Sequence, residues 1–185
     1  MKENVEPNKT RIKRMLGLYN MVPNLLWSII NLVPISVYCY REMSLTWLFV
    51  FLLASLVPIF LSNKFIDRIQ LGRTTAVYKK LGVPIVTKLT QNGPFINRLI
   101  RKKFPEYKVV SYQRSSIKKL LQQTYVFEKF HLVLFVFFSL NTVYALSKND
   151  FDWAATICVT NVIYNIYPNL LQQYIRLKLL LYTKK

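Results

Sequence analysis

The sequence predicts an all-α integral membrane protein with four transmembrane helices and a basic cytoplasmic loop of amphipathic helices lying against the membrane. Of its 185 residues, 52% are hydrophobic and 15% aromatic, and the mean hydropathy is above zero, so the chain is oilier than an ordinary soluble domain. The apolar residues gather in runs of about 20, the length that crosses a hydrocarbon core of about 30 Å. The charged residues lie between these runs. We therefore treat residues 1–185 as a single membrane domain.

Two apolar stretches near the N-terminus predict an antiparallel helical hairpin. The first covers residues 22–40 and the second residues 44–62. Because residues 41–43 leave a very short connection, the second helix has to return beside the first. Pro34 lies inside the first stretch and is expected to kink it. The basic residues before position 22 precede a full-length span and not the short apolar core of a signal peptide, so we expect this segment to be retained.

Residues 63–114 form a different kind of sequence, the cytoplasmic interfacial region. This region holds twelve Lys or Arg against two acidic residues, with Ile, Leu and Phe at helical spacing between the basic positions. Such a pattern is typical of helices lying in the membrane interface with their lysines toward phosphates. Gly72 and the stretches 82–84 and 92–94 mark turns. We expect an ordered, membrane-apposed region and not a linker.

The C-terminal half predicts two more spans joined by a short turn. Residues 115–145 begin as a basic amphipathic helix and continue, without Gly or Pro, into the third span. Residues 153–171 form the fourth span, and residues 172–185 a basic C-terminal helix. Asparagines recur every four residues along the fourth span, at positions 161, 165 and 169. Because an unpaired amide is expensive in hydrocarbon, this stripe is expected to face protein or water, with contact between helices as the favoured interpretation.

The placement of charge predicts the orientation. The net charge is +18, and 23 of the 26 Lys and Arg residues fall on one side of the predicted membrane. The positive-inside rule then places both termini and the long loop in the cytoplasm, in a multi-pass protein of the plasma (inner) membrane. Basic residues near a bilayer are attracted to anionic lipid headgroups by ~1 kcal/mol each. Anionic lipid, and not nucleic acid, is therefore the expected counter-charge.

Glu128 and His131, the one histidine in the chain, are the strongest candidates for chemistry. They are three residues apart, so on a helix they share a face near the cytoplasmic entrance of the third span. A carboxylate beside an imidazole can fix its tautomer and raise its basicity, as general-base catalysis on a hydroxyl requires. The fourth helix reaches the same level with polar residues that are expected to line a shared pocket for an amphipathic lipid: Asn165, Gln172, Tyr174 and Arg176.

A structural interpretation of the same residues stays open and is favoured by spacing alone. Glu128 can pair with Lys129 or Arg176, and His131 can be a hydrogen-bonded residue of the interface. Cys39 and Cys158 lie in apolar segments with no disulfide or metal-ligand spacing, so we predict no metal and no cofactor. The common nucleotide-binding, serine-hydrolase, zinc and acyltransferase motifs are absent from the sequence.

The sequence nevertheless resembles the glycosyl-4,4'-diaponeurosporenoate acyltransferase family, small bacterial membrane enzymes of carotenoid biosynthesis. The family motif E-T-x-R-A-E-x-x-H-W is similar to QTYVFEKFHL at residues 123–132, which keeps the Thr, the second Glu and the His. A second motif, N-x-P followed by Q-R-Y-N-R-x-R-L, is similar to Asn165 and to QQYIRLKL at residues 172–179. A fainter likeness lies at Tyr78, Gly82-Val83 and Gly93. The resemblance covers about residues 78–179.

This resemblance implies transfer of a fatty acyl group to a hydroxyl of a glycosylated, carotenoid-glycoside-like lipid. It implies that His131 is the base and Glu128 its orienting carboxylate. Polar contacts to the sugar or to the acyl donor would come from Gln172, Tyr174 and Arg176, and an acyl-thioester would be a suitable donor. Donor and acceptor would approach from the cytoplasmic leaflet, where the basic loop attracts anionic groups.

Two other function classes remain in view. The chain can be a non-catalytic scaffold or accessory subunit that docks a membrane protein partner through its basic cytoplasmic face, since several residues of the family motifs are replaced. A small transporter or channel is a weaker alternative, because the spans carry few charges and the sequence has no visible inverted repeat.

Overall fold

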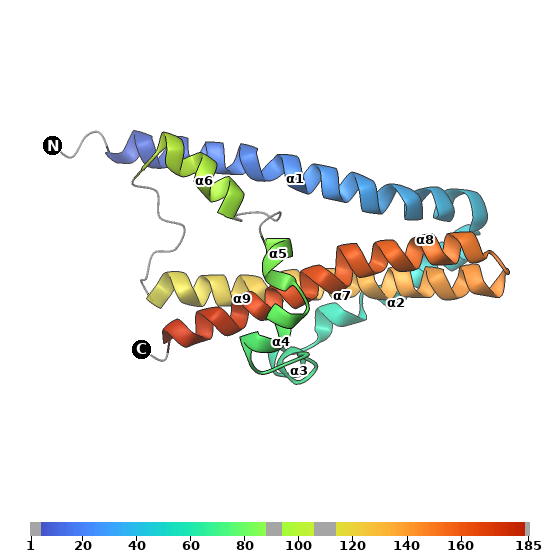
Figure 1. Ribbon diagram of the computed structural model, residues 1–185. Helices are drawn as coiled ribbons and strands as arrows, with labels where there is room; N and C mark the ends of the chain where they lie inside the picture. The colour runs from blue at the N-terminus through green and yellow to red at the C-terminus, as the bar shows by residue number, and fades with distance from the viewer. Residues whose placement is uncertain (1–4, 88–93, 106–113, 184–185) are drawn as a thin grey trace.

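The structure is a computed structural model that describes residues 5–87, 94–105 and 114–183 (Figure 1). Within these ranges the chain is helical and contains no strand, which confirms the all-α prediction. The helices in chain order are α1 (Val5–Glu42), α2 (Leu45–Ser55), the 3-10 helix η1 (Val57–Phe60), α3 (Asn63–Arg68), α4 (Thr75–Lys80), α5 (Val83–Thr87), α6 (Pro94–Lys103), α7 (Arg114–Ser147), α8 (Phe151–Asn161), the π-helix η2 (Val162–Ile166) and α9 (Tyr167–Thr183).

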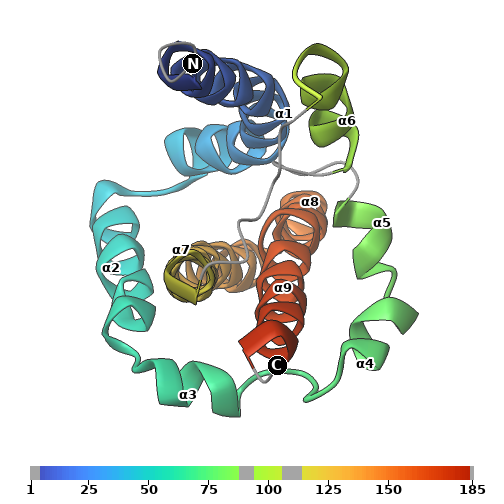
Figure 2. The same ribbon diagram turned by 90° about the vertical axis from the view of Figure 1, so that its left-hand side faces the viewer.

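Helix α7 is the central element of the bundle (Figure 2). It packs against α8, η2 and α9 on one side and against α2 and η1 on the other. Helices α8, η2 and α9 follow one another as a continuous rod that runs antiparallel to α7 (Figure 1). Helix α1 contacts α6 and α8, and the short helices α4 and α5 contact α9. The segment between α2 and α6 thus wraps around the α7 and α9 pair.

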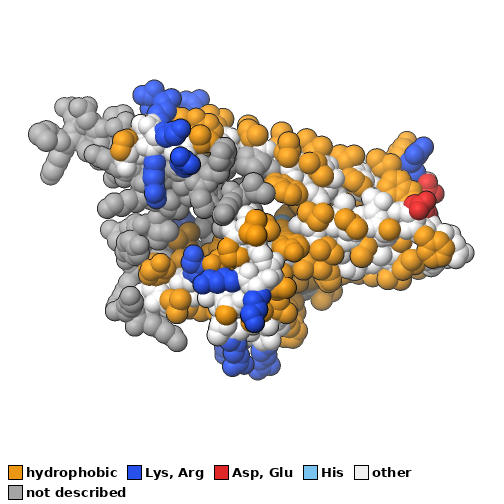
Figure 3. All heavy atoms as spheres, viewed as in Figure 1, with side chains coloured by type: hydrophobic (Ala, Val, Ile, Leu, Met, Phe, Trp, Pro, Cys, Tyr) orange, Lys and Arg blue, Asp and Glu red, His pale blue; other side chains and the backbone are white. Residues whose placement is uncertain are grey.

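Two helices are long and apolar enough to cross a membrane, Arg14–Glu42 and Ile117–Ser147. The stretch Leu45–Phe60 is also apolar but shorter. Apolar side chains cover much of the surface toward one end of the molecule, and Lys and Arg side chains gather toward the other (Figure 3). Exposed apolar residues on α1 and α2, such as Val22, Leu25 and Leu53, belong to this apolar surface. Because a soluble monomer rarely exposes so much apolar area, the surface is typical of a membrane protein.

The expected helix 44–62 is interrupted in the structure. Helix α2 ends at Ser55, and η1 continues the chain with Pro58 in its first turn. Proline has no backbone N–H and clashes with the preceding turn, so it favours an interruption of the α-helical ladder at this position. Pro34, by contrast, lies within α1, which runs as one helix from Val5 and so includes the basic N-terminal residues. Gly93 and the turn at residues 92 and 93 lie outside the described residues.

The connection between α7 and α8 is a tight turn encoded by Lys148, Asn149 and Asp150. The Asp150 N–H donates to the Ala145 carbonyl at 3.0 Å and the Asn149 N–H to the Leu146 carbonyl at 3.0 Å. Asn149 adopts a positive φ of 59°, a conformation that asparagine tolerates better than most residues. The Asp150 carboxylate then accepts from the Trp153 N–H and caps α8. These bonds turn the chain back along α7.

Two glycines give opposite predictions for stability. Gly82 has a φ of +73° between α4 and α5, whereas Gly17 lies in helix α1 with no atom near its would-be Cβ. We expect Gly82→Ala to lower the free energy of unfolding by about 1–2 kcal/mol, because a Cβ strains the left-handed conformation. Gly17→Ala is expected to raise it by up to about 1 kcal/mol through helix propensity. Unfolding in mixed micelles measures both, and equal effects of the same sign would contradict the assignment.

Candidate functional site

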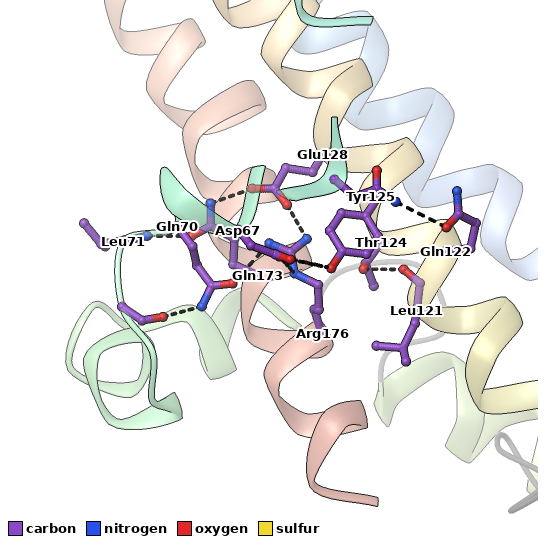
Figure 4. Close-up of polar contacts among 12 residues, drawn as sticks. Asp67, Gln70, Leu71, Leu121, Gln122, Thr124, Tyr125, Glu128, Gln173 and Arg176 are labelled. Atoms are coloured by element: carbon purple, nitrogen blue, oxygen red, sulfur yellow. Dashed lines mark hydrogen bonds and ion pairs between the residues drawn. The ribbon is translucent and has the colours of Figure 1, made fainter. Parts of the chain in front are cut away.

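A buried ion pair between α7 and α9 forms the centre of a polar cluster (Figure 4). The Arg176 Nη1 lies 2.5 Å from the Glu128 Oε2, and each side chain is 1% exposed. Among the described side chains, Arg176 is the one Lys or Arg that is fully buried. Removing two charges from water is costly and is offset only by close pairing with further hydrogen bonds. Each of the two charges therefore requires the other.

Gln173 supplies the second contact to Glu128 and extends the cluster to the interfacial region. Its Nε2 donates to the Glu128 Oε1 at 2.6 Å, so that α9 engages both carboxylate oxygens. Its Oε1 accepts from the Tyr78 hydroxyl at 2.9 Å and from the Leu71 N–H at 3.2 Å. A single amide thus connects α7, α9 and the chain that follows α3.

Arg176 is also held from the side of α3. Its Nε lies 3.3 Å from the Asp67 Oδ1, and its Nη2 donates to the Gln70 Oε1 at 3.2 Å. The ring of Tyr125 stacks on the guanidinium at 4.4 Å, and the Tyr125 hydroxyl donates to Asp67 at 3.0 Å. Asp67 is half exposed, so its ion pair is weaker than that of Glu128. We call the seven residues of this cluster the α7–α9 clamp: Asp67, Gln70, Tyr78, Tyr125, Glu128, Gln173 and Arg176.

Local sequence explains why the interfacial residues reach the clamp. Ser62 caps α3 by accepting from the Phe65 N–H at 3.2 Å, and the fully buried Ile66 anchors this short helix. A Cβ at Gly72 would lie 3.0 Å from a methyl group of Val77, so a larger residue here would have to displace that side chain. The Tyr78 hydroxyl oxygen accepts from the Gly72 N–H at 3.1 Å. Burial raises the pKa of Tyr78, so its hydroxyl keeps its proton and remains a donor at neutral pH.

His131 lies one turn further along α7, in separate surroundings. Its ring packs edge-on against Tyr164 with centroids 5.9 Å apart, next to Asn165. Its Nδ1 is buried and has no hydrogen-bond partner among the described residues. The side chain as a whole is half-buried. The Asn165 side chain and the Tyr164 backbone lie close enough to interact with the ring, so the imidazole has polar neighbours although its Nδ1 makes no hydrogen bond.

The expected pairing of Glu128 with His131 is not formed in the described structure. Both Glu128 oxygens point to Gln173 and Arg176. Glu128 contacts Arg176 of α9, whereas the His131 ring, about one turn further along α7, packs against Tyr164 of η2. Lys129 donates instead to the Ile59 carbonyl at 3.3 Å, at the end of η1. Of the two structural partners expected for Glu128, Lys129 and Arg176, the structure contains the pairing with Arg176.

The other predicted site residues divide between two places. Asn165 is fully buried and donates to the Asn161 Oδ1 at 2.8 Å, while Asn161 donates to Ser139 on α7 at 3.1 Å. The asparagine stripe thus faces α7, as expected of contacts between helices. Tyr174 packs its ring against Tyr78 at 6.3 Å, beside the clamp. Gln172 is half-buried on α9, next to Gln173, which makes the contact to Glu128.

A π-helical turn sets the position of the asparagine stripe relative to α9. In η2 the Tyr167 N–H bonds to the Val162 carbonyl, five residues back, which adds one residue to the turn. Such single turns are frequent at functional sites. The turn carries Tyr164 and Asn165, the two neighbours of His131.

Sequence reasoning missed Asp67, Gln70, Tyr125 and Gln173. One signal for Asp67 was present, because it is one of two acidic residues among twelve basic ones in the interfacial region. An acid in such a region is a natural partner for a buried cation elsewhere. Gln70, Tyr125 and Gln173 gave no comparable signal, since Gln and Tyr are ordinary residues of an amphipathic helix.

The fold and the clamp together describe a helical bundle with an apolar surface typical of membrane proteins and a polar cluster toward its basic end. Residues 62–185 match the profile of the family described as glycosyl-4,4'-diaponeurosporenoate acyltransferase. This match covers more than half of the chain, so the protein belongs to that family, which confirms the resemblance of its motifs. Comparisons with curated proteins and with solved structures gave no match.

The buried ion pair predicts a strongly coupled double-mutant cycle. We expect Arg176→Met to lower the free energy of unfolding by about 3–5 kcal/mol, because it leaves Glu128 buried and unpaired. Adding Glu128→Gln is expected to recover most of that loss. Denaturant unfolding of the four proteins in mixed micelles measures the coupling. Additive losses would show that the two side chains do not depend on each other.

Proposed function

We propose that this protein transfers a fatty acyl group to a hydroxyl of a glycosylated, carotenoid-type membrane lipid at the cytoplasmic leaflet. The observation that carries the proposal is the unbonded Nδ1 of His131, one turn along α7 from a buried charged clamp, in a chain of this family. A base has to be within reach of a substrate proton and free to accept it. The unbonded Nδ1 of His131 supports the second property, and the family resemblance of the motif that contains His131 supports the first.

The proposed reaction uses His131 as a general base. Its Nδ1 takes the proton from a sugar hydroxyl as the hydroxyl oxygen attacks the carbonyl carbon of an acyl-thioester. The C–O bond of the new ester forms, the C–S bond breaks, and the thiol leaves with the proton that the imidazole returns. Tyr164 and Asn165 limit the positions of the ring. The nucleophile is thus the hydroxyl of the substrate, and the base is supplied by α7.

Glu128 and Arg176 act as positioning residues in this proposal. Both are fully buried, and Glu128 is engaged by two donors from α9, which suits a structural pair better than a group that touches substrate. The pair fixes the register of α7 against α9, and with it the distance between His131 and Tyr164. Tyr174 and Gln172 lie on the same helix and remain candidates for contacts to the sugar or donor.

The proposed location follows from the distribution of charge. Basic side chains on α3, α4 and α6, such as Lys64, Lys79 and Arg101, are exposed near the end of the bundle that carries the clamp. They would attract an anionic acyl donor and anionic headgroups to that surface. With four spans, both termini and this surface would face the cytoplasm. The hydroxyl of the acceptor would stay at the polar boundary, while its apolar part remains in the bilayer.

A non-catalytic scaffold is the second candidate function. It is favoured by the pairing inside the clamp. Glu128 and Arg176, which were expected at a substrate site, are bonded to each other within the protein. On this alternative the clamp only holds the interfacial region in place, and a protein partner would dock on its basic surface. The two functions differ in whether His131 is needed.

Replacement of His131 tests the catalytic proposal. We expect His131→Ala to reduce acyl transfer by purified protein at least about 100-fold, as the loss of a general base does. Acyl transfer from a thioester to a glycosylated carotenoid lipid is measured by mass spectrometry of the product. Val126→Ala, at an exposed position on α7, is the matched control and is expected to keep full activity.

Glu128→Gln separates positioning from catalysis. It keeps the hydrogen bond to Gln173, so we expect a reduced rate but not a loss as large as that of His131→Ala. Unchanged acyl transfer in His131→Ala protein would contradict the proposed catalytic role of His131. If a partner protein also co-purifies with that variant, the scaffold function is supported.

The proposed topology is tested by cysteine accessibility. After Cys39 and Cys158 are replaced by Ser, single cysteines are introduced as Lys102→Cys on α6 and Lys148→Cys in the turn before α8. We expect an impermeant thiol reagent added to intact cells to label the second and not the first, because the two positions lie on opposite sides of the membrane. Labelling of both in intact cells would contradict the cytoplasmic placement of α6.

A further inference from the structure

A polar pocket of about 500 Å³ lies at the end of the bundle away from the clamp, where α1 and α7 end and α8 begins. It takes no part in the proposed reaction. Its lining residues are Tyr38, Glu42, Tyr144, Lys148, Asn149 and Asp150. Tyr38 is fully buried, and its hydroxyl has no hydrogen-bond partner among the described residues. A buried hydroxyl without a partner is costly, so it points to a ligand in this pocket.

The charges of the pocket are of both signs and are not paired with each other. Asp150 is already engaged, because its side chain caps α8. Glu42 and Lys148 are exposed, and no ion pair joins Lys148 to either carboxylate in the part of the chain that the structure describes. The Lys148 amino group lies over the Tyr144 ring at 5.7 Å. The pocket thus presents a separate carboxylate and ammonium, which complement a ligand that carries both charges.

An apolar groove of about 480 Å³ lies on the neighbouring side of the same helix end. The groove is lined by Ile35 and Cys39 of α1, Met43 in the connection to α2, Leu48 of α2 and Phe137 of α7. Phe137 and Tyr144 are seven residues apart, so groove and pocket follow one stripe of α7. Residues 38 and 42, which line the pocket, lie about a third of a helical turn from those that line the groove. An apolar groove next to a charged pocket has the layout of a lipid tail and its head.

We propose that this end of the bundle binds one phospholipid whose head carries a primary ammonium and a phosphate. The ammonium donates hydrogen bonds to the Glu42 carboxylate and to the Tyr38 hydroxyl, and the phosphate faces Lys148. One acyl chain lies along the groove between α1 and α2. Tyr40 and Leu45, at the open side of the groove, are strongly exposed, so the chain can enter from the surrounding lipid. This inference is independent of the proposed function.

Lipid retention tests the proposal. The full chain is placed in vesicles with equal amounts of phosphatidylethanolamine, phosphatidylcholine and phosphatidylglycerol, purified in mild detergent, and its bound lipid is quantified by mass spectrometry. We expect phosphatidylethanolamine to be enriched roughly tenfold over phosphatidylcholine, because methylation removes the N–H donors that charged hydrogen bonds need. Phosphatidylglycerol, which has no ammonium, is expected to be retained no better than phosphatidylcholine.

Variants locate the effect. Glu42→Gln is expected to abolish the enrichment, and Tyr38→Phe to reduce it several-fold while keeping the ring that packs on Trp153. Arg41→Gln, an exposed neighbour outside the pocket lining, is the matched control and is expected to retain it. Equal retention of the three lipids, preference for phosphatidylglycerol, or an enrichment that survives Glu42→Gln would each overturn the proposal.

Discussion

The buried pair of Glu128 and Arg176 is the constraint on which the arrangement of the C-terminal half depends. Two fully buried charges 2.5 Å apart tolerate little change in the spacing or rotation of the helices that carry them. The hydrogen bonds of Gln173 and the stacking of Tyr125 surround the same two groups, so α3 and the segment up to Tyr78 are tied to them as well. The interfacial region is therefore ordered by chemistry that lies inside the bundle.

Toward the C-terminal end of α7, beyond the clamp, the contact between α7 and the rod of α8, η2 and α9 remains polar for several turns. Asn165 bonds to Asn161, and Asn161 bonds to Ser139 and to the Phe135 carbonyl. In an apolar surrounding such contacts compensate for the weak hydrophobic drive between helices. His131 lies at this contact with an unbonded nitrogen. The same contact thus combines structural amides with the histidine that we propose as the catalytic base.

Sequence patterns predicted the helical class and the position of the polar groups, because both depend on local periodicity and on the cost of burying charge. The prediction that Glu128 and Arg176 come to one level of the bundle rested on where two helices cross the membrane interface, and the structure places them in contact. The break at Pro58 and the π turn were not predicted. The choice of Glu128 for Arg176 over His131 depends on side-chain direction between packed helices, which spacing along one helix does not determine.

The π turn has a consequence for the rotation of α9. One extra residue between Val162 and Tyr167 advances everything after it by about 100° around the helix axis. Without that residue, the guanidinium of Arg176, which follows the π turn, would face away from α7. Asn161 precedes the turn and would keep its contacts with α7. The π turn therefore changes the rotation of α9 relative to α8. As a result, Asn161 of α8 and Arg176 of α9 both face α7, at different depths of the bundle.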